Sequence, residues 1–360
     1  MFPASLYQPI YLILVTILTF WIMQYYNQSV LSNLNRVQTS KSLYAFLICV
    51  FMIYFIGNRP ISGACFVDMG NYYDNYSVIF GDKFYFDKEA ENLFFDNWFA
   101  WMASEMIDIT YVFLIFAAIY FSLMFVACRK LFPKDTLLAF IVYLAAFSTF
   151  SYGTNGMKAG MAASTFLVAL AYYDKLWISI PLAIFTLGQH HSMALVIASY
   201  FLVLIVKNPK YYFGGWIVCV IMAALHVSFF QFLFAGFADE RGADYLSGGF
   251  DSGFRIDFIL YSAVPVAIGY LMIFEYGLIK SRTYNIILNL YLTTNSFWML
   301  CMYSESSNRI AYLSWFLYPI VLLYPFVNII WHNQQIRYLR YAVYGHLAFT
   351  LFMMFIYYSK

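Results

Sequence analysis

Long apolar runs separated by short polar breaks extend along most of this chain. A membrane-spanning helix needs about 20 mostly apolar residues, and the runs approach that length repeatedly. The predicted spans are 8–25, 43–57, 109–128, 136–151, 159–173, 176–190, 192–206, 211–235, 257–275, 284–303, 310–330 and 341–358. The shorter runs in the middle of the chain are expected to be tilted or re-entrant. The pattern therefore predicts an all-α, polytopic transmembrane helix bundle of about 10–12 spans.

The composition supports this interpretation. The chain has 360 residues, of which 63% are hydrophobic and 11% charged, and an ordinary soluble domain carries far more charge. We expect a single transmembrane domain over residues 1–360. The net charge of +2 and the lack of a basic block give no reason to expect a nucleic-acid partner. The first run, 10–23, lacks a basic leader and a small-residue cleavage site, so we interpret it as a span.

The charged residues predict an orientation. If the first polar break faces the cytoplasm and the sides alternate, the inner loops hold twelve of the twenty Lys and Arg residues. They hold only three of the eighteen acids, namely Asp135, Asp174 and Glu275. Short cytoplasmic loops are enriched in Lys and Arg. The pattern therefore favours twelve spans with both termini outside.

Two polar segments on the predicted outer side are longer than a turn. The first, 58–108, contains half of the chain's acids. Within 89–105 the sequence predicts an amphipathic helix that lies in the membrane interface or packs on the bundle. Its apolar side would carry Phe94, Phe95, Trp98, Trp101 and Met102, and its polar side mainly Glu91, Asn92, Asp96, Asn97 and Glu105. The second segment, 238–257, is rich in Gly and is interpreted as a lid or a plain surface loop.

The motifs of soluble enzymes are absent from the sequence. It contains no GxGxxG, Walker, GxSxG or HExxH pattern, and we expect no cofactor. Five cysteines without a CxxC pair give neither a metal motif nor a disulfide framework. Polar residues at the outer ends of the spans are the remaining candidates, because ionisable groups at membrane depth need a partner or a function.

Four outer cations are candidate ligands of a phosphate group: Arg59, Lys158, Arg255 and Arg309. A guanidinium binds two phosphate oxygens at once. Lys158 opens a helix of small residues, and a helix N-terminus already attracts anions. Together they would suit a lipid diphosphate. The alternatives are that Arg59 reaches the headgroups, or that the cations form structural ion pairs with Asp68, Asp257 and Glu305.

Possible proton-transferring groups lie in the same outer segments. Gln189-His190-His191-Ser192 contains the one pair of adjacent histidines, and a histidine titrates near neutral pH. Asp68 and Glu91 are carboxylate candidates, and Tyr72 is a candidate for stacking on a sugar. A structural histidine and solvated surface acids are the plainer alternatives.

The order of these segments resembles the EpsG family of Wzy-like exopolysaccharide and O-antigen polymerases. The similar features are Gly57-Asn58-Arg59 followed by Asp68 and Tyr72, Glu91 before an aromatic stretch, Asn155 three residues before Lys158, His190-His191-Ser192, and Asn308-Arg309-Ile310-Ala311-Tyr312. One position departs from the family pattern, which usually has Arg where this chain has Lys158. Lysine keeps the charge but loses the bidentate geometry.

The resemblance implies polymerisation of oligosaccharide repeats carried on undecaprenyl diphosphate, at the periplasmic face of a bacterial inner membrane. His190, Asp68 and Glu91 would be the catalytic candidates. The substrate-binding candidates would be Arg59, Tyr72, Asn155, Lys158, Arg255, Asn308 and Arg309. Besides the lipid-linked oligosaccharide and membrane lipids, a flippase and a chain-length regulator of the same pathway are the expected partners. No metal is implied.

Two other classes of function remain open at this stage. One is another membrane glycan transferase, such as a ligase that moves a finished glycan or a single sugar. The other is a polysaccharide transporter or flippase, for which ionisable residues near mid-membrane and two related halves are typical. In this chain the charges gather at one predicted face and no twofold repeat is evident, which favours a transferase.

Overall fold

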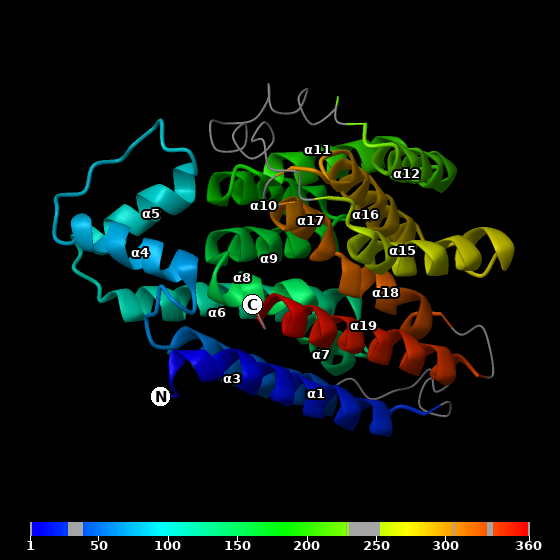
Figure 1. Cartoon of the computed structure of the whole chain (residues 1–360), viewed down its shortest axis with the longest axis horizontal. Helices are drawn as coiled ribbons and strands as arrows, with labels where there is room; N and C mark the ends of the chain where they lie inside the picture. Colours follow the sequence, from blue (N-terminus) through cyan, green and yellow to red (C-terminus); the bar gives the residue numbers. More distant parts are fainter. Residues whose placement is uncertain are drawn as a thin grey trace. The chain divides into compact units, whose positions relative to one another are not determined.

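The structure is a computed structural model that describes residues 2–27, 39–227, 229, 253–304, 307–329 and 334–358. All regular structure in these ranges is helical (Figure 1), as the sequence predicts. Most of the predicted second loop, 238–257, and Glu305 lie outside the described residues. The chain divides into two compact units. Unit 1 contains Met1–Ala194 and Phe326–Lys360, and unit 2 contains Leu195–Pro325.

Unit 1 is a helix bundle built around α6. Its apolar helices are α1 (Tyr7–Tyr25), α3 (Thr39–Gly57), α6 (Ile109–Leu131), α7 (Thr136–Leu144), α8 (Phe147–Thr154), α9 (Met157–Ala171), α10 (Leu176–Gln189) and α19 (Gln335–Tyr358), with a short 3-10 turn, η1 (Ala4–Leu6). Helix α6 packs against α3, α7 and α9, while α9 also packs against α8 and α10. Helix α1 packs against α7 and α19, so the two terminal segments lie side by side (Figure 1).

Unit 2 is organised around α16. Its helices are α12 (Pro209–Ala224), α15 (Ile256–Tyr270), the π-helical η2 (Leu271–Glu275) that continues α15, α16 (Arg282–Leu300), α17 (Ser307–Trp315) and α18 (Tyr318–Val327). Helix α11 (Met193–Ile205) begins at the end of unit 1 and continues into unit 2. Helix α16 packs against α12, α15 and α17.

A buried amide connects the helices of unit 2. The Asn295 side chain accepts a hydrogen bond from Trp216 Nε1 at 2.8 Å and donates to Ser262 Oγ and Ser314 Oγ at 3.1 and 3.0 Å. Trp315 Nε1 donates to the same Ser262 hydroxyl at 2.9 Å. Buried polar groups need partners, and here the partners of this α16 side chain come from three other helices, α12, α15 and α17.

The helices differ in how well they suit a membrane. Among the described residues five are long and apolar enough to cross one, or six when the bent pair α7 and α8 is taken as one span. The five segments are Ala4–Tyr25, Ile109–Leu131, Ile256–Glu275, Ser307–Val327 and Gln335–Ile356. Four shorter apolar helices, Ser42–Gly57, Met157–Ala171, Leu176–Gln189 and Met193–Ile205, account for much of the difference from the 10–12 spans predicted. Each predicted run begins in or contains a described helix, but the end of the run 211–235, beyond α12, lies mostly outside the described residues.

The run 136–151 is not one straight helix. Helices α7 and α8 meet at an angle of 74° because Ala146 is extended, with φ −73° and ψ 138°. The Thr149 hydroxyl donates to the Tyr143 carbonyl oxygen at 2.6 Å and its backbone N–H donates to Ala146 O at 3.0 Å. Both bonds serve backbone groups that the broken helix leaves without an intrahelical partner.

Glycine permits the close approach of α3 and α6. A Cβ on Gly57 would lie 2.7 Å from Leu114 Cδ1 and 2.9 Å from Leu114 Cα. A contact that close to the backbone cannot be relieved by a side-chain rotation. The end of α3, just before Arg59, is therefore held directly against α6.

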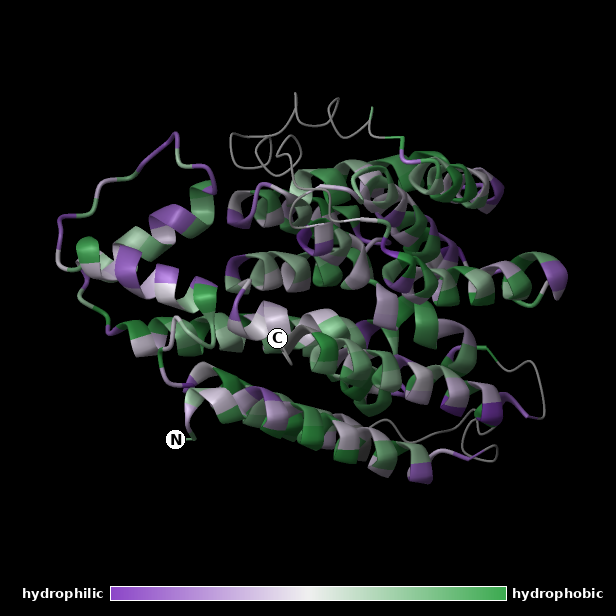
Figure 2. Cartoon of the chain, in the orientation of Figure 1, coloured by the Kyte–Doolittle hydropathy of each residue, from purple (hydrophilic) through white to green (hydrophobic). Residues whose placement is uncertain are grey.

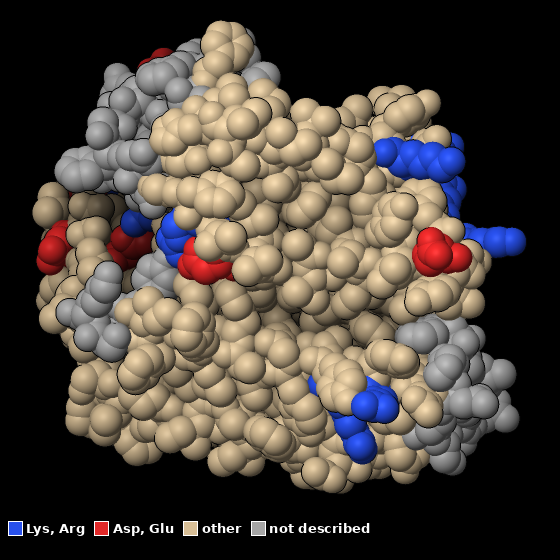
Figure 3. All heavy atoms as spheres, turned by 45° about the vertical axis from the view of Figure 1, so that its right-hand side comes forward, with Lys and Arg blue, Asp and Glu red and all other residues tan. Residues whose placement is uncertain are grey.

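The long segment 58–108 folds into two helices, α4 (Val67–Val78) and α5 (Leu93–Ser104). Hydrophilic residues gather on α4 and in the connection between the two helices (Figure 2). The sequence analysis did not predict α4, whose polar residues conceal a narrow apolar stripe that includes buried Met69 and Tyr76. On the face of the molecule drawn in Figure 3, by contrast, Lys, Arg, Asp and Glu occupy only small patches.

Helix α5 packs on protein through one aromatic side. Phe95 and Phe99 contact Tyr72 of α4 and Phe116 of α6, with ring centroids 5.4–6.3 Å apart. The predicted division of its faces was wrong for four residues. Phe94 and Trp101, placed on the apolar side, are 39% and 41% exposed, whereas Asn92 and Asn97, placed on the polar side, are 0% and 6% exposed.

Asn97 is buried because it holds the segment that precedes the helix. Its amide donates to Asp87 O and Leu93 O and accepts from Asp87 N, each at 2.7 Å. A side chain that supplies three hydrogen bonds to backbone groups is satisfied without water.

Candidate functional site

Three helix ends in unit 1 bring the candidate polar residues together. They are the start of α5, the start of α9 and the turn that follows α10. The contact between α5 and α10 is close, since a Cβ on Gly188 would overlap the Phe94 ring. The Phe94 and Phe185 rings stack across the same contact, with centroids 5.1 Å apart. Glycine in α10 thus lets the start of α5 lie beside the histidine pair.

His191 pairs with Glu91. Its Nδ1 lies 2.9 Å from Glu91 Oε1, and both side chains are partly exposed. The two atoms lie at ion-pair distance. A carboxylate beside Nδ1 favours a proton on that nitrogen and leaves the lone pair of the neutral ring at Nε2. This is the arrangement that makes an imidazole a proton acceptor.

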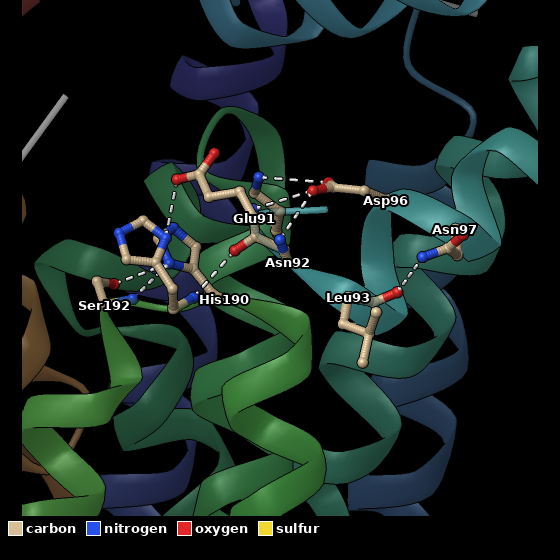
Figure 4. Close-up of polar contacts among 9 residues, drawn as sticks. Glu91, Asn92, Leu93, Asp96, Asn97, His190 and Ser192 are labelled. Carbon is tan, nitrogen blue, oxygen red and sulfur yellow. Dashed lines mark hydrogen bonds and ion pairs between the residues drawn. The ribbon is translucent and has the colours of Figure 1, made fainter. Parts of the chain in front are cut away.

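His190 has the opposite tautomer preference. Its Nδ1 lies 2.8 Å from Ser192 Oγ and accepts the Ser192 backbone N–H at 3.3 Å (Figure 4). Since a backbone N–H can only donate, Nδ1 is the acceptor and the neutral ring carries its proton on Nε2. The two rings are stacked, with centroids 5.5 Å apart. One turn therefore presents a donor and an acceptor side by side.

Asn92 joins the histidine turn to α5. It is fully buried, and its Oδ1 accepts the His191 backbone N–H at 2.9 Å. Asp96, one turn into α5, accepts from the Asn92 backbone N–H at 2.9 Å and from its Nδ2 at 3.3 Å (Figure 4). A carboxylate is favourable in the first turn of a helix, so these bonds also stabilise the start of α5.

Lys158 extends the same chain of contacts to α9. Its Nζ lies 3.7 Å from Asp96 Oδ1 and 5.3 Å from the centroid of the Phe95 ring, and 19% of its side chain is exposed. Lys158 lies in the first turn of α9, where the helix dipole disfavours a cation. Asp96 offsets that cost at a distance too long for a strong ion pair, so an incoming anion can compete for the ammonium group.

Arg59 is buried rather than extended to the surface. It is 3% exposed, and its terminal nitrogens donate to Ile56 O and Thr154 O, each at 2.7 Å. These carbonyls belong to the last turns of α3 and α8, where the helix dipoles favour a cation. Its Nε is buried and has no hydrogen-bond partner among the described residues. Burial lowers the pKa of the guanidinium to about 9, so Arg59 stays charged at neutral pH.

The other candidates of unit 1 lie on neighbouring elements. Asp68 is in the first turn of α4 and is half-buried. The Tyr72 ring packs among Phe95, Phe99 and Phe116. Asn155 is the C-cap of α8, and its buried Oδ1 has no hydrogen-bond partner in the part of the chain that the structure describes. Tyr72 is linked to Lys158 through Phe95, because the Phe95 ring contacts both side chains.

The remaining candidates lie in unit 2. Arg255 donates to both oxygens of Asp257 at 3.0 and 2.7 Å, and its guanidinium lies 3.6 Å from the centroid of the Phe258 ring. This is the structural ion pair named above as an alternative. Asn308 accepts the Arg309 backbone N–H at 3.0 Å, and the Arg309 side chain is exposed. The proposed roles of these residues in binding a diphosphate stay predictions.

Two features of this arrangement are not evident from the sequence. Adjacent histidines give no reason to choose between the two rings; the resemblance points to His190, whereas His191 is the ring that lies beside Glu91. Asn92 was assigned to a polar helix face, but it contacts a residue 99 positions away in the chain. One local signal exists in the sequence: Asn92 followed by Asp96 is typical of the start of a helix.

Comparison with known proteins agrees with the resemblance seen in the sequence. Residues 42–360 match the EpsG family, which covers most of the chain and every candidate residue named above. Neither the curated proteins nor the solved structures include a match. Because the family match extends over far more than half of a chain with several membrane-spanning helices, this multi-pass membrane protein belongs to the EpsG family.

Proposed function

We propose that this protein is a polymerase of lipid-linked oligosaccharide repeats. It would act at the periplasmic face of a bacterial inner membrane, with undecaprenyl diphosphate as the carrier of donor and acceptor. The observation that supports this most directly is the chain of contacts from His191 through Asn92 and Asp96 to Lys158. It brings an imidazole beside a carboxylate and a cation to the same end of unit 1. A glycosyl transfer from a diphosphate needs a base for the acceptor hydroxyl, here the imidazole, and a cation for the leaving diphosphate.

The proposed reaction assigns the proton to His191. The acceptor hydroxyl gives its proton to Nε2, and Glu91 stabilises the imidazolium that forms. The hydroxyl oxygen bonds to the reducing-end carbon of the donor chain as the bond from that carbon to the diphosphate breaks. His190, which carries its proton on Nε2, can donate a hydrogen bond to a sugar oxygen in the same turn.

Lys158 is assigned to the leaving group. Negative charge grows on the diphosphate as the bond breaks, so a nearby cation stabilises the transition state more than the ground state. Arg59 supports this position, since its bond to Thr154 O fixes the end of α8 next to the start of α9. Asn155, whose buried Oδ1 has no hydrogen-bond partner within the described residues, lies in the turn between α8 and α9. Arg255 and Arg309 are proposed as further contacts to the carrier.

The test is a polymerisation assay with the purified full-length protein and an undecaprenyl-diphosphate oligosaccharide. We expect wild type to give a ladder of repeats and Lys158→Ala to lower the rate about 10²–10³-fold, the usual effect of losing one transition-state contact. Lys158→Arg keeps the charge and should retain most activity. Lys83→Ala is the matched control, because Lys83 is an exposed lysine in the segment between α4 and α5.

Other outcomes would indicate a different function or a different role for Lys158. A single addition from wild type would indicate a ligase or another glycan transferase. Substrate that crosses the membrane without extension would indicate a transporter. A full ladder from Lys158→Ala would remove the assignment of Lys158 to the diphosphate.

A further inference from the structure

A second basic cluster lies wholly within unit 2. It surrounds a pocket of about 150 Å³ between the C-terminal part of α11 and the first turns of α16. Lys207, Lys280 and Arg282 line the pocket together with Asn285, Asn289 and three aliphatic side chains. None of these residues takes part in the contacts described for the candidate site of unit 1.

The charge around this pocket has one sign. Lys207 follows the end of α11, while Lys280 and Arg282 flank Ser281, the N-cap of α16. The Ser281 hydroxyl accepts the Tyr284 backbone N–H at 3.3 Å. The N-terminus of α16 adds partial positive charge. All lining residues belong to the described part of the chain, and none of them is acidic. The pocket therefore suits an anion.

Two asparagines of α16 indicate that the ligand also carries a hydrogen-bond donor. Asn285 and Asn289 are one turn apart and so share a helix face, and Asn289 is 1% exposed. The Oδ1 atoms of both are buried without a hydrogen-bond partner among the described residues. A buried acceptor needs a donor. A phosphate at neutral pH offers mainly acceptor oxygens, whereas a hydroxyl group can donate.

The size of the pocket limits the ligand. Pockets for drug-sized molecules measure about 300–1,000 Å³, so 150 Å³ accommodates a phosphate and a short polyol. An oligosaccharide or a nucleotide would not be enclosed. The lysines, exposed at the rim, are among those that the charge pattern assigns to the cytoplasmic side, where basic pockets between helices bind anionic headgroups.

We propose that this pocket binds a phosphate ester of a small polyol, with the chemistry of a glycerol phosphate. The phosphate lies among Lys207, Lys280 and the N-terminus of α16, and the polyol hydroxyls donate to Asn285 and Asn289. The group is supplied either by the headgroup of an anionic membrane lipid or by a soluble glycerol phosphate. Such a ligand would connect the end of α11 with the start of α16.

The experiment separates these two sources. The full-length protein in neutral detergent is mixed with phosphatidylglycerol or phosphatidylcholine, and retained lipid is measured by native mass spectrometry. In parallel, the thermal unfolding midpoint is measured with added glycerol phosphate or inorganic phosphate. We expect selective retention of phosphatidylglycerol if the ligand is a lipid, and stabilisation by glycerol phosphate if it is soluble.

Substitutions of the lining residues test whether the ligand binds in this pocket. Lys207→Gln with Lys280→Gln should weaken binding roughly tenfold or more, since each lysine near an anionic surface contributes on the order of 1 kcal/mol. Asn289→Asp places a carboxylate in the pocket lining and should weaken ligand binding further. Lys210→Gln is the matched control, because Lys210 is an exposed cation three residues from Lys207 that does not line the pocket. Unchanged unfolding midpoints without ligand show that the variants fold.

Three results would overturn the proposal. The first is that neither phosphatidylglycerol nor glycerol phosphate binds the wild-type protein. The second is that the double lysine variant binds as tightly as wild type. The third is that inorganic phosphate binds as tightly as glycerol phosphate, which would leave the two asparagines without a role.

Discussion

The two adjacent histidines differ because their Nδ1 atoms meet different neighbours. Beside His191 lies the Glu91 carboxylate, and beside His190 lies a backbone N–H that can only donate. One ring is thereby prepared to accept a proton at Nε2 and the other to donate one. A residue next to a catalytic group in the sequence therefore need not share its chemistry.

This difference predicts unequal effects of the two substitutions. His191→Ala removes the proposed base and should lower the polymerisation rate about 10²–10⁴-fold. Glu91→Gln keeps the shape of the side chain but removes the charge that stabilises the imidazolium, so it should impair the same step. His190→Ala should cost less, since it removes only a hydrogen-bond donor. Initial rates with a lipid-linked oligosaccharide measure all three, and a larger loss in His190→Ala would reverse the assignment of the base.

Asp108 gives a pH dependence that does not involve the candidate site. Its carboxylate caps α6 by accepting from Thr110 Oγ1 at 2.6 Å and Thr110 N at 2.8 Å, and these bonds lower its pKa. A carboxyl group with a lowered pKa stabilises the fold above its unfolded pKa of about 3.9. That contribution is lost as the pH falls through the folded value.

Asp108→Ala should therefore destabilise the protein at pH 7 by about 1 kcal/mol, the usual effect of losing an N-cap. Asp108→Asn keeps an acceptor oxygen and should retain most of the cap. Thermal unfolding in detergent, followed by circular dichroism at pH 7 and pH 3, measures both. The difference between wild type and Asp108→Ala should shrink at pH 3, and an equal difference at both pH values would contradict the carboxylate cap.

At the scale of helices, the apolar pattern predicted where most elements lie, because each helix buries or exposes a long hydrophobic surface. It did not predict the break after Leu144, which depends on a single extended residue and a threonine hydroxyl. It also missed α4, whose apolar stripe is too narrow to stand out. A local sequence pattern is also insufficient for the site. It identifies Lys158 and the histidines as candidates, but the Asn92 contact that helps to join them connects residues 99 positions apart.

Helix packing makes Gly57 sensitive to substitution. Gly57→Ala would place a methyl group 2.9 Å from the backbone of α6, so α3 must move away, and overpacking of this kind costs about 1–3 kcal/mol. In Gly345→Ala the new methyl group of α19 meets nothing within 4 Å, and better helix propensity should make that change neutral or slightly stabilising. The unfolding midpoint of Gly57→Ala should lie below that of wild type, whereas that of Gly345→Ala should equal or exceed it. Equal midpoints would show that α3 and α6 are less closely packed.

At the scale of the whole molecule, the proposed function requires that the candidate site face away from the cytoplasm. The positive-inside rule predicts this orientation, since Lys and Arg gather in the short loops at the other ends of the spans. It can be tested at two exposed residues. Tyr85, 73% exposed, precedes α5 on the predicted outer side, and Lys210, also exposed, lies in the first turn of α12 on the predicted inner side.

A cysteine at each position gives a direct readout in a Cys65→Ser, Cys219→Ser background, because these two native cysteines are partly exposed and the other three are buried. A membrane-impermeant maleimide should modify Tyr85→Cys in intact spheroplasts, whereas Lys210→Cys should react only after the membrane is lysed. Modification of Lys210→Cys from outside would invert the topology. His191 and Lys158 would then face the cytoplasm, where a polymerase of exported glycan repeats could not use them, and the phosphate ester pocket of unit 2 would open to the periplasm instead.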